Sequence, residues 1–89
     1  MVGYKILFSK LAVKDAKKLS GIKLDLKAKE LIEIIRNNPF QNPPPYEKLV
    51  GNLSGAYSRR INIKHRIVYQ VREKDKVVRI LRMWSHYGE

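Results

Sequence analysis

The stretch that decides the fold is Tyr57–Ser85, YSRRINIKHRIVYQVREKDKVVRILRMWS, in the C-terminal half of the 89-residue chain. It holds three runs rich in β-branched and aromatic residues, at 57–63, 66–72 and 77–85. Such runs are typical of strands. Because the links at 64–65 and 73–76 are short enough for hairpins, they predict an antiparallel meander of three strands.

The N-terminal half predicts one strand and two helices. A short apolar and aromatic run over 4–9 indicates the strand. Apolar residues recur at helical spacing over 12–19, where Ser20-Gly21 supplies a stop, and again over 24–35, where Asn37-Asn38-Pro39 ends the pattern. The predicted fold class is α+β, with an N-terminal strand, a two-helix hairpin and then the antiparallel meander sheet.

The segment 38–45, NPFQNPPP, separates the helices from the sheet. It can neither continue a helix nor donate a regular hydrogen-bond ladder, so it predicts a stiff connection. A proline-rich ligand for an SH3-type domain is the alternative, but a connector explains the prolines with fewer assumptions.

Length and composition limit the class of protein. A chain of 89 residues with 44% hydrophobic residues predicts a single globular domain over 1–89. The absence of cysteine excludes disulfides, thiolate zinc sites and cysteine nucleophiles. No apolar run approaches the roughly 18 residues of a membrane span, and no signal-peptide pattern is visible, so we expect a cytoplasmic protein with no membrane partner.

The charge predicts a polyanionic partner. The chain has 19 Lys and Arg against 8 Asp and Glu, a formal charge of +11. No acid lies between Glu47 and Glu73, and this interval contains the cations Lys48, Arg59, Arg60, Lys64, Arg66 and Arg72. One sheet face must cover the helices, so the other is expected to present strand arginines, including Arg79 and Arg82, to a nucleic acid. A solvated basic face without a ligand is the alternative.

The residues also limit the chemistry. Carboxylates are scarce in the C-terminal half, which disfavours a catalytic metal site. RNA can be cut without a metal, because its 2′-hydroxyl attacks the adjacent phosphorus when one group removes the proton and another protonates the departing 5′-oxygen. Glu47 and His86 are candidates for these two groups. Taken alone, each could instead be an ordinary loop acid and a surface histidine near the terminus.

A family resemblance lies in two motifs and the terminal residues: NLSGAYSRRI at 52–61, HRIVY at 65–69, and His86-Tyr87. The chain resembles the YoeB/Txe toxins of the RelE superfamily, endoribonucleases of type II toxin–antitoxin modules, most closely the Txe branch. The resemblance implies a microbial-ribonuclease-like fold and metal-independent, cofactor-free cleavage of messenger RNA in the ribosomal A site. That reaction leaves a 2′,3′-cyclic phosphate and inhibits translation.

The resemblance also implies roles for individual residues. Glu47 would be the general base, Arg66 would stabilise the phosphate, His86 would be the general acid, and Tyr87 would orient the substrate. The residues expected at the RNA are Lys48, Arg59, Arg60, Lys64 and His65, of which Arg59 and Arg60 could instead support the base, and His65 could be structural. The chain departs from the family at Val50, where relatives can carry a basic residue, and at the extension Gly88-Glu89.

The implied partners are messenger RNA, the ribosome and a Phd/YefM-type antitoxin, with a homodimer possible. An antitoxin for so basic a protein would use an acidic, partly disordered segment. One alternative function is a non-catalytic RNA- or ribosome-binding translation inhibitor, which would need the cations but not Glu47 or His86. Another is a topoisomerase-inhibiting relative on the same fold. Trp84 and Tyr57 could stack on bases, although Trp84 is better explained as a core residue.

Overall fold

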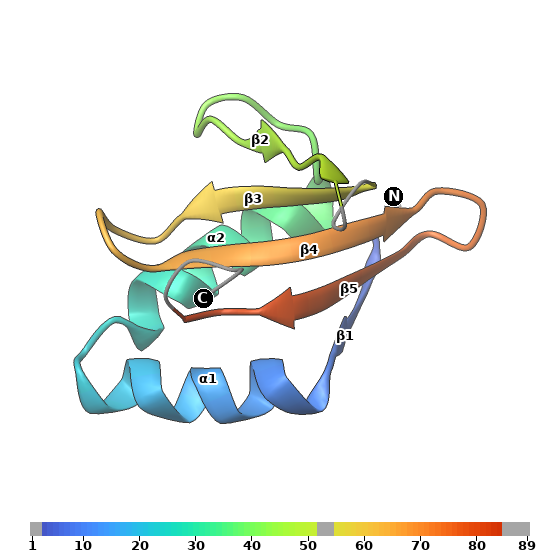
Figure 1. Ribbon diagram of the computed structural model, residues 1–89. Coiled ribbons are helices and arrows are strands. Elements are labelled where there is room, and N and C mark those ends of the chain that lie inside the picture. Colours follow the sequence, from blue (N-terminus) through green and yellow to red (C-terminus); the bar gives the residue numbers. More distant parts are fainter. Residues whose placement is uncertain (1–2, 52–54, 85–89) are drawn as a thin grey trace.

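The computed structural model describes residues 3–51 and 55–84, and its strands form a single sheet that packs against two helices (Figure 1). In chain order the elements are β1 (Lys5–Phe8), α1 (Lys10–Gly21), α2 (Asp25–Asn37), β2 (Glu47–Lys48), β3 (Ala56–Arg60), β4 (Arg66–Arg72) and β5 (Val77–Arg82). The predicted α+β class and the order of strand, two helices and sheet are confirmed.

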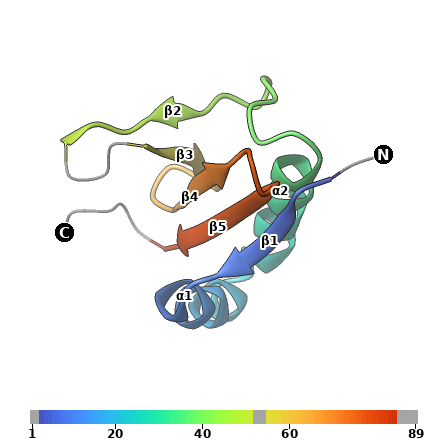
Figure 2. The ribbon, with the colours of Figure 1, turned by 90° about the vertical axis from the view of Figure 1, so that its right-hand side faces the viewer.

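The sheet has the strand order β1-β5-β4-β3-β2 (Figure 2). Strands β3, β4 and β5 form the predicted antiparallel meander. Strand β1 pairs in parallel with β5, so the first and last strands are neighbours. This pairing and the two-residue edge strand β2 were not predicted, because neither a long crossover nor so short a strand leaves a local sequence pattern.

Two predicted strands are shorter in the structure. Strand β3 ends at Arg60 rather than residue 63, because residues 61–65 form a turn. In this turn the side-chain oxygen of Asn62 accepts hydrogen bonds from the backbone N–H groups of Lys64 and His65. Strand β5 ends at Arg82. The Asn62 side chain thus takes backbone donors that could otherwise pair with a neighbouring strand, and a turn forms although Ile61 and Ile63 are β-branched.

The main core lies between the helices and one face of the sheet. Helix α1 contributes Ala12 and Leu19, and α2 contributes a stripe of buried apolar residues. The buried members of this core are Ala12, Leu19, Ala28, Leu31, Ile32, Ile35, Ile61, Ile67, Tyr69, Val78, Ile80 and Met83. The apolar stripes that predicted the helices are therefore the surfaces that they bury. No helix in the described part of the chain has the length and apolar character to cross a membrane.

The opposite face of the sheet, here called the open face, carries the alternate residues of each strand. Its centre holds a small apolar cluster of Leu49, Ala56 and Val68, with Leu81 packed against it. The prediction that cations occupy this face is therefore only partly right, because apolar side chains occupy its middle.

Candidate functional site

Glu47 and Arg66 meet on the open face of the sheet. A carboxylate oxygen of Glu47 lies 3.4 Å from Nη1 of Arg66. Glu47 is directly opposite Ser58 in the strand register, and Ser58 is opposite Val68, two positions beyond Arg66. Since side chains two positions apart share a face, the register brings these strands' polar groups together. The Glu47 side chain is 66% exposed and that of Arg66 is 17% exposed.

Arg60 adds a second cation beside this pair. Arg60 lies directly opposite Arg66 where β3 and β4 pair. Like charges in opposed positions destabilise a sheet, so this placement has a cost that a bound anion would offset. The residues around the resulting hollow, of about 250 Å³, are Pro44, Pro45, Tyr46, Glu47, Ser58, Arg60 and Arg66. Two arginines against one carboxylate leave an excess positive charge there.

The structure does not support a direct RNA contact by Arg59. The residue is only 1% exposed, and its side chain lies on the opposite face of β3 from that of Arg60. The guanidinium donates to the hydroxyl of Tyr69 and to the backbone carbonyls of Pro39, Gln41 and Pro44. Its donors are engaged inside the molecule, so of the two roles expected for Arg59 this arrangement favours support of the base over contact with RNA.

The other cations predicted at the RNA have different environments. Lys48 is exposed on β2, but it is opposite Tyr57 and so lies on the other face of the strand from Glu47. Lys64 is exposed in the turn. His65 is only 9% exposed, and its ring lies 4.4 Å from that of Trp84, centroid to centroid. This burial agrees with the structural alternative for His65 and does not support an RNA contact.

The chain approaches the site again at its last described residue. The backbone N–H of Arg66 donates to the carbonyl of Trp84 at 2.9 Å. The Trp84 ring packs against the main core, and Tyr69 is fully buried there. His86 and Tyr87, the predicted acid and substrate-orienting residue, lie outside the described residues. Trp84, two residues before His86 in the sequence, is therefore hydrogen-bonded to the strand that carries Arg66.

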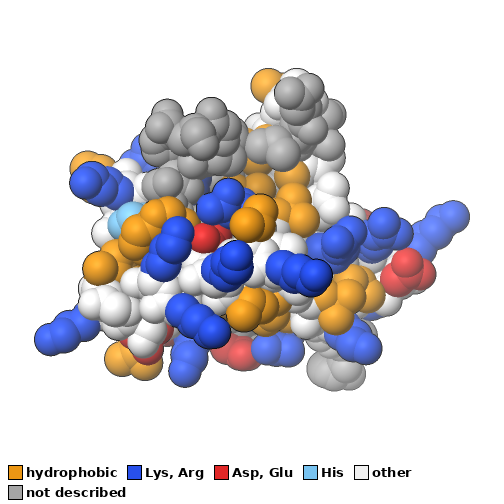
Figure 3. Space-filling model, turned by 60° about the horizontal axis from the view of Figure 1, so that its bottom comes forward, with side chains coloured by type: hydrophobic (Ala, Val, Ile, Leu, Met, Phe, Trp, Pro, Cys, Tyr) orange, Lys and Arg blue, Asp and Glu red, His pale blue; other side chains and the backbone are white. Residues whose placement is uncertain are grey.

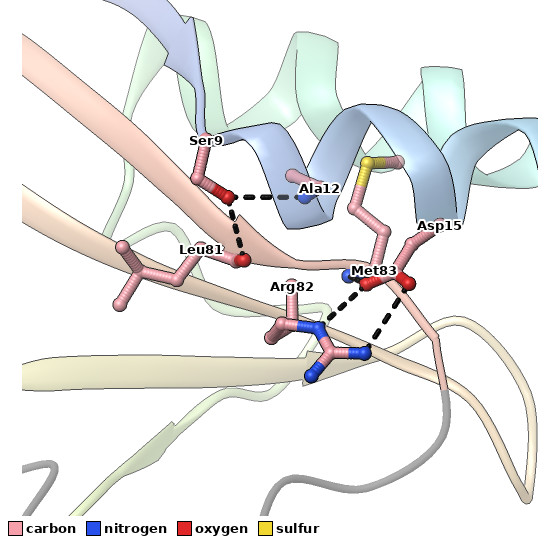
Figure 4. Close-up of polar contacts among 6 residues, drawn as sticks. All are labelled: Ser9, Ala12, Asp15, Leu81, Arg82 and Met83. Atoms are coloured by element: carbon pink, nitrogen blue, oxygen red, sulfur yellow. Dashed lines mark hydrogen bonds and ion pairs between the residues drawn. The ribbon is translucent and has the colours of Figure 1, made fainter.

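An ion pair that the sequence did not predict fixes this end of β5 to α1 (Figure 4). Asp15 is 1% exposed, and its carboxylate accepts from Nε of Arg82 at 2.8 Å and from the backbone N–H of Met83 at 3.0 Å. The serine that caps α1, Ser9, also donates from its hydroxyl to the carbonyl of Leu81 at 2.8 Å. Arg82 lies opposite Val68 in the strand register and its side chain is 37% exposed, but its guanidinium is paired with Asp15.

The environment of Asp15 shifts its pKa. Burial alone raises the pKa of this carboxyl, but the hydrogen bonds from Arg82 and Met83 and the charges of Arg82 and Lys18 outweigh burial and lower it overall. The sequence signal for this group is the position of an acid among apolar residues, three residues after Ala12 and four before Leu19. An acid on the apolar stripe of a helix indicates a buried, paired group.

Two other surface features lie outside this hollow. A larger, mostly apolar hollow of about 410 Å³ lies between the helices, with Ala16, Ala28 and Ile32 in its lining. Lys and Arg side chains spread over the face shown in Figure 3, with hydrophobic side chains between them. Within residues 3–51 and 55–84, no three His, Asp or Glu side chains gather as ligands for a metal ion. The Glu47–Arg60–Arg66 hollow, in contrast, combines a proton acceptor with two anion-binding groups.

The family match and the similar known proteins both identify the same family of toxins. Residues 12–87 match the family described as YoeB-like toxin of bacterial type II toxin-antitoxin system. The chain is 44% identical to Toxin YoeB of Synechocystis sp. over 48 residues, which span 54% of this chain and 56% of that protein's length. The Txe branch is not singled out, so that finer assignment stays a prediction.

Solved structures share the fold over nearly the whole chain. A YoeB/ParE toxin from Agrobacterium tumefaciens is 26% identical, with a TM-score of 0.84, and the match covers 93% of this chain and 99% of that one. The toxin in a YoeB-YefM complex from Staphylococcus aureus is 39% identical, with a TM-score of 0.78, over 94% of this chain and 98% of that one. The predicted RelE/YoeB-like fold is therefore confirmed.

Proposed function

Since the chain belongs to the family of YoeB-like toxins of bacterial type II toxin–antitoxin systems, we propose that it is a metal-independent endoribonuclease that cuts messenger RNA on the ribosome. Cleavage of the message in the A site would stop translation. The observation that carries the proposal is the Glu47–Arg66 pair, with Arg60 opposite Arg66, around one open hollow.

The proposed reaction is an internal transesterification of the RNA. Glu47 takes the proton of the 2′-hydroxyl, whose oxygen then forms a bond to the adjacent phosphorus. The bond from phosphorus to the 5′-oxygen breaks, and His86 gives its proton to that oxygen. The products are a 2′,3′-cyclic phosphate and a 5′-hydroxyl, and no water, metal or redox partner is consumed.

The two arginines have the role of stabilising charge. In the transition state, negative charge builds up on the non-bridging phosphate oxygens, and fixed cations nearby lower its energy. Arg66 is largely buried and sits on a central strand, so its guanidinium has little freedom to move. A phosphate that binds between Arg66 and Arg60 would also relieve the repulsion between them.

The proposed partners follow from the charge and from the family. The Staphylococcus aureus relative is found in a YoeB-YefM complex. We therefore propose an antitoxin of the Phd/YefM type, whose acidic segment would neutralise part of the +11 charge of this chain. The ribosome would orient the message in the hollow, and the site of action would be the cytoplasm.

The test compares wild-type protein with Glu47→Gln and His86→Gln on ribosome-bound message. We expect either substitution to reduce cleavage by about 10²- to 10⁴-fold, because each removes one proton-transfer group. Ribosome affinity should be unchanged. Wild-type cleavage should persist in EDTA, with the magnesium that ribosomes need replaced by polyamines, and should leave a 2′,3′-cyclic phosphate.

Two results would contradict the proposal. Full translation inhibition by both variants without RNA cleavage would instead support a non-catalytic ribosome-binding protein. A 3′-hydroxyl on the upstream fragment would exclude attack by the 2′-hydroxyl. Glu33→Gln is the matched control, because Glu33 is an exposed acid on α2 that pairs with Arg36 at 3.3 Å.

A further inference from the structure

The buried guanidinium of Arg59 organises the segment that leads into Glu47. Its Nη2 donates to the carbonyls of Gln41 at 2.8 Å and Pro39 at 3.0 Å, and its Nη1 donates to the carbonyl of Pro44. Its Nε donates to the hydroxyl of Tyr69 at 3.1 Å. Three of these four hydrogen bonds therefore hold three points of the loop 39–44, and the fourth joins the guanidinium to Tyr69 of β4.

Burial of this charge needs a structural reason. An arginine that is 1% exposed has lost its hydration, and this cost is large unless its donors are satisfied. Within residues 3–51 and 55–84, the four oxygens that accept hydrogen bonds from Arg59 are all neutral. A guanidinium is suited to this role, because its donors point in fixed directions within one plane.

The loop held by Arg59 also forms one wall of the candidate site. Pro44, Pro45 and Tyr46 line the same hollow as Glu47. The Tyr46 ring lies over the Arg59 guanidinium, with 5.1 Å from its centroid to Cζ. The Tyr69 hydroxyl completes the network by donating to the carbonyl of Pro39 at 2.8 Å. The guanidinium thus lies behind the wall that presents Glu47.

We propose that Arg59 is a positioning residue for the Glu47 carboxylate, which acts from the core through the loop 39–44 and does not contact RNA. The proposal rests on the proposed function of Glu47 as general base. Strand β2 is only two residues long and lies at the sheet edge, so its own pairing with β3 is a weak constraint. The hydrogen bonds of Arg59 fix the loop that precedes β2, and so restrict the position of Glu47 more than the pairing of this short strand can.

Arg59→Lys tests this role because it keeps the charge and removes the planar set of donors. We expect kcat to fall by about 10- to 100-fold, as for a reacting group displaced by about an ångström. KM should change little. The salt dependence of RNA binding should also be unchanged, whereas loss of a real phosphate contact would lower its slope by about one.

Two further variants complete the experiment. Tyr69→Phe removes only the hydroxyl that bridges Arg59 and Pro39, and should lower kcat several-fold, which keeps the test valid if Arg59→Lys does not fold. Arg36→Lys is the matched control, because Arg36 is an exposed arginine on α2. In a Glu47→Gln background, Arg59→Lys should have no further effect on kcat, because no base remains to be positioned.

A second readout does not depend on cleavage. The backbone N–H of Leu49 donates to the carbonyl of Ala56 at 3.0 Å, next to β2. Its hydrogen exchange should become faster in Arg59→Lys while exchange in β4 and β5 is unchanged. If the wild type cuts no RNA, the proposed function fails, but this exchange still reports on the anchoring of β2. Unchanged kcat together with unchanged Leu49 exchange, or a loss confined to KM and the salt slope, would overturn the positioning role.

Discussion

Arg59 and Arg60 are consecutive residues of β3, yet their side chains lie on opposite faces of the sheet and have opposite environments. Arg59 is buried under the loop 39–44 and donates to oxygens of the protein itself. Arg60 is exposed on the open face, opposite Arg66 and beside the hollow that holds Glu47. The comparison shows that the strand face, and not the residue type, decides whether a cation is available to a ligand.

The same contrast distinguishes the two faces as a whole. On the helix-covered side, Asp15 and Arg59 are buried, and their hydrogen bonds fix one part of the chain to another. On the open face, Arg60 lies opposite Arg66, and both Arg60 and the Glu47 carboxylate that pairs with Arg66 are exposed. A fold can retain such unfavourable pairs where a bound anion compensates for them.

The largest difference between the two faces should appear in stability. Ile67 is fully buried on the helix-covered face, opposite Arg59 in the strand register. We expect Ile67→Ala to lower the free energy of unfolding by about 2–5 kcal/mol, because it removes buried methyl groups and leaves a cavity. Urea unfolding followed by circular dichroism measures this change.

Ile63→Ala is the matched control for that experiment. Ile63 is 84% exposed in the turn after β3, so the same chemical change should alter stability by less than about 0.5 kcal/mol. Equal losses for the two variants would contradict the assignment of one isoleucine to the core and the other to the surface.

The next largest effect concerns the buried carboxylate on the helix-covered side. Asp15→Asn should lower the free energy of unfolding at pH 7 by about 1–3 kcal/mol, because it weakens charged hydrogen bonds to Arg82 and Met83. The pKa of Asp15 is lower in the folded state than its ordinary value. Its stabilising contribution is therefore present above about pH 4 and is lost as the pH falls through the folded pKa.

Because the pKa of Asp15 is lowered in the folded state, the difference in stability between wild type and Asp15→Asn should depend on pH. Wild-type stability should fall more steeply below about pH 4 than that of Asp15→Asn, so the two curves should converge in acid. Urea unfolding at a series of pH values between 2 and 7 measures the difference. A constant gap between the curves would show that the Asp15 carboxyl has the same pKa in the folded and unfolded states.

The sequence predicted the parts of this fold that depend on periodicity. Apolar spacing over 24–35 gave α2, and β-branched runs gave β3, β4 and β5, because these patterns are local. The parallel contact of β1 with β5 was not predictable in this way, since it depends on how a two-helix connection returns the chain to the sheet.

The candidate site was predictable in its residue types but not in its allocation of arginines. The resemblance implied the same alternatives for Arg59 and Arg60, contact with RNA or support of the base, but the alternation of β3 places their side chains on opposite faces. Burial of Arg59 depends on carbonyls of the loop 39–44, which are 15–20 residues away and invisible to any local pattern. His86 and Tyr87 lie outside the described residues, so their roles stay predictions.

Arg60→Gln tests whether the open face binds RNA, and its expected effect on RNA affinity is smaller than the effects on stability described above. We expect weaker binding to any RNA sequence and a salt slope smaller by about one, because a phosphate contact is lost without loss of base readout. Binding titrations at several salt concentrations measure both quantities. Arg59→Lys is the comparison: an equal change in its slope would mean that both arginines contact RNA.

The smallest predicted effect concerns the stability of the proposed base itself. Glu47→Gln should change the free energy of unfolding by less than about 0.5 kcal/mol, even though it should abolish most cleavage, because Glu47 is largely exposed and its ion pair with Arg66 is long. Thermal unfolding at low and high salt measures this, since a contribution from the ion pair would shrink as salt screens it. A loss above about 1 kcal/mol would mean that Glu47 holds the edge strand in place, so that reduced cleavage by Glu47→Gln could no longer be assigned to proton transfer alone. Near-neutral stability with lost cleavage is the result expected of a group on the open face, where the fold does not depend on the charges it presents.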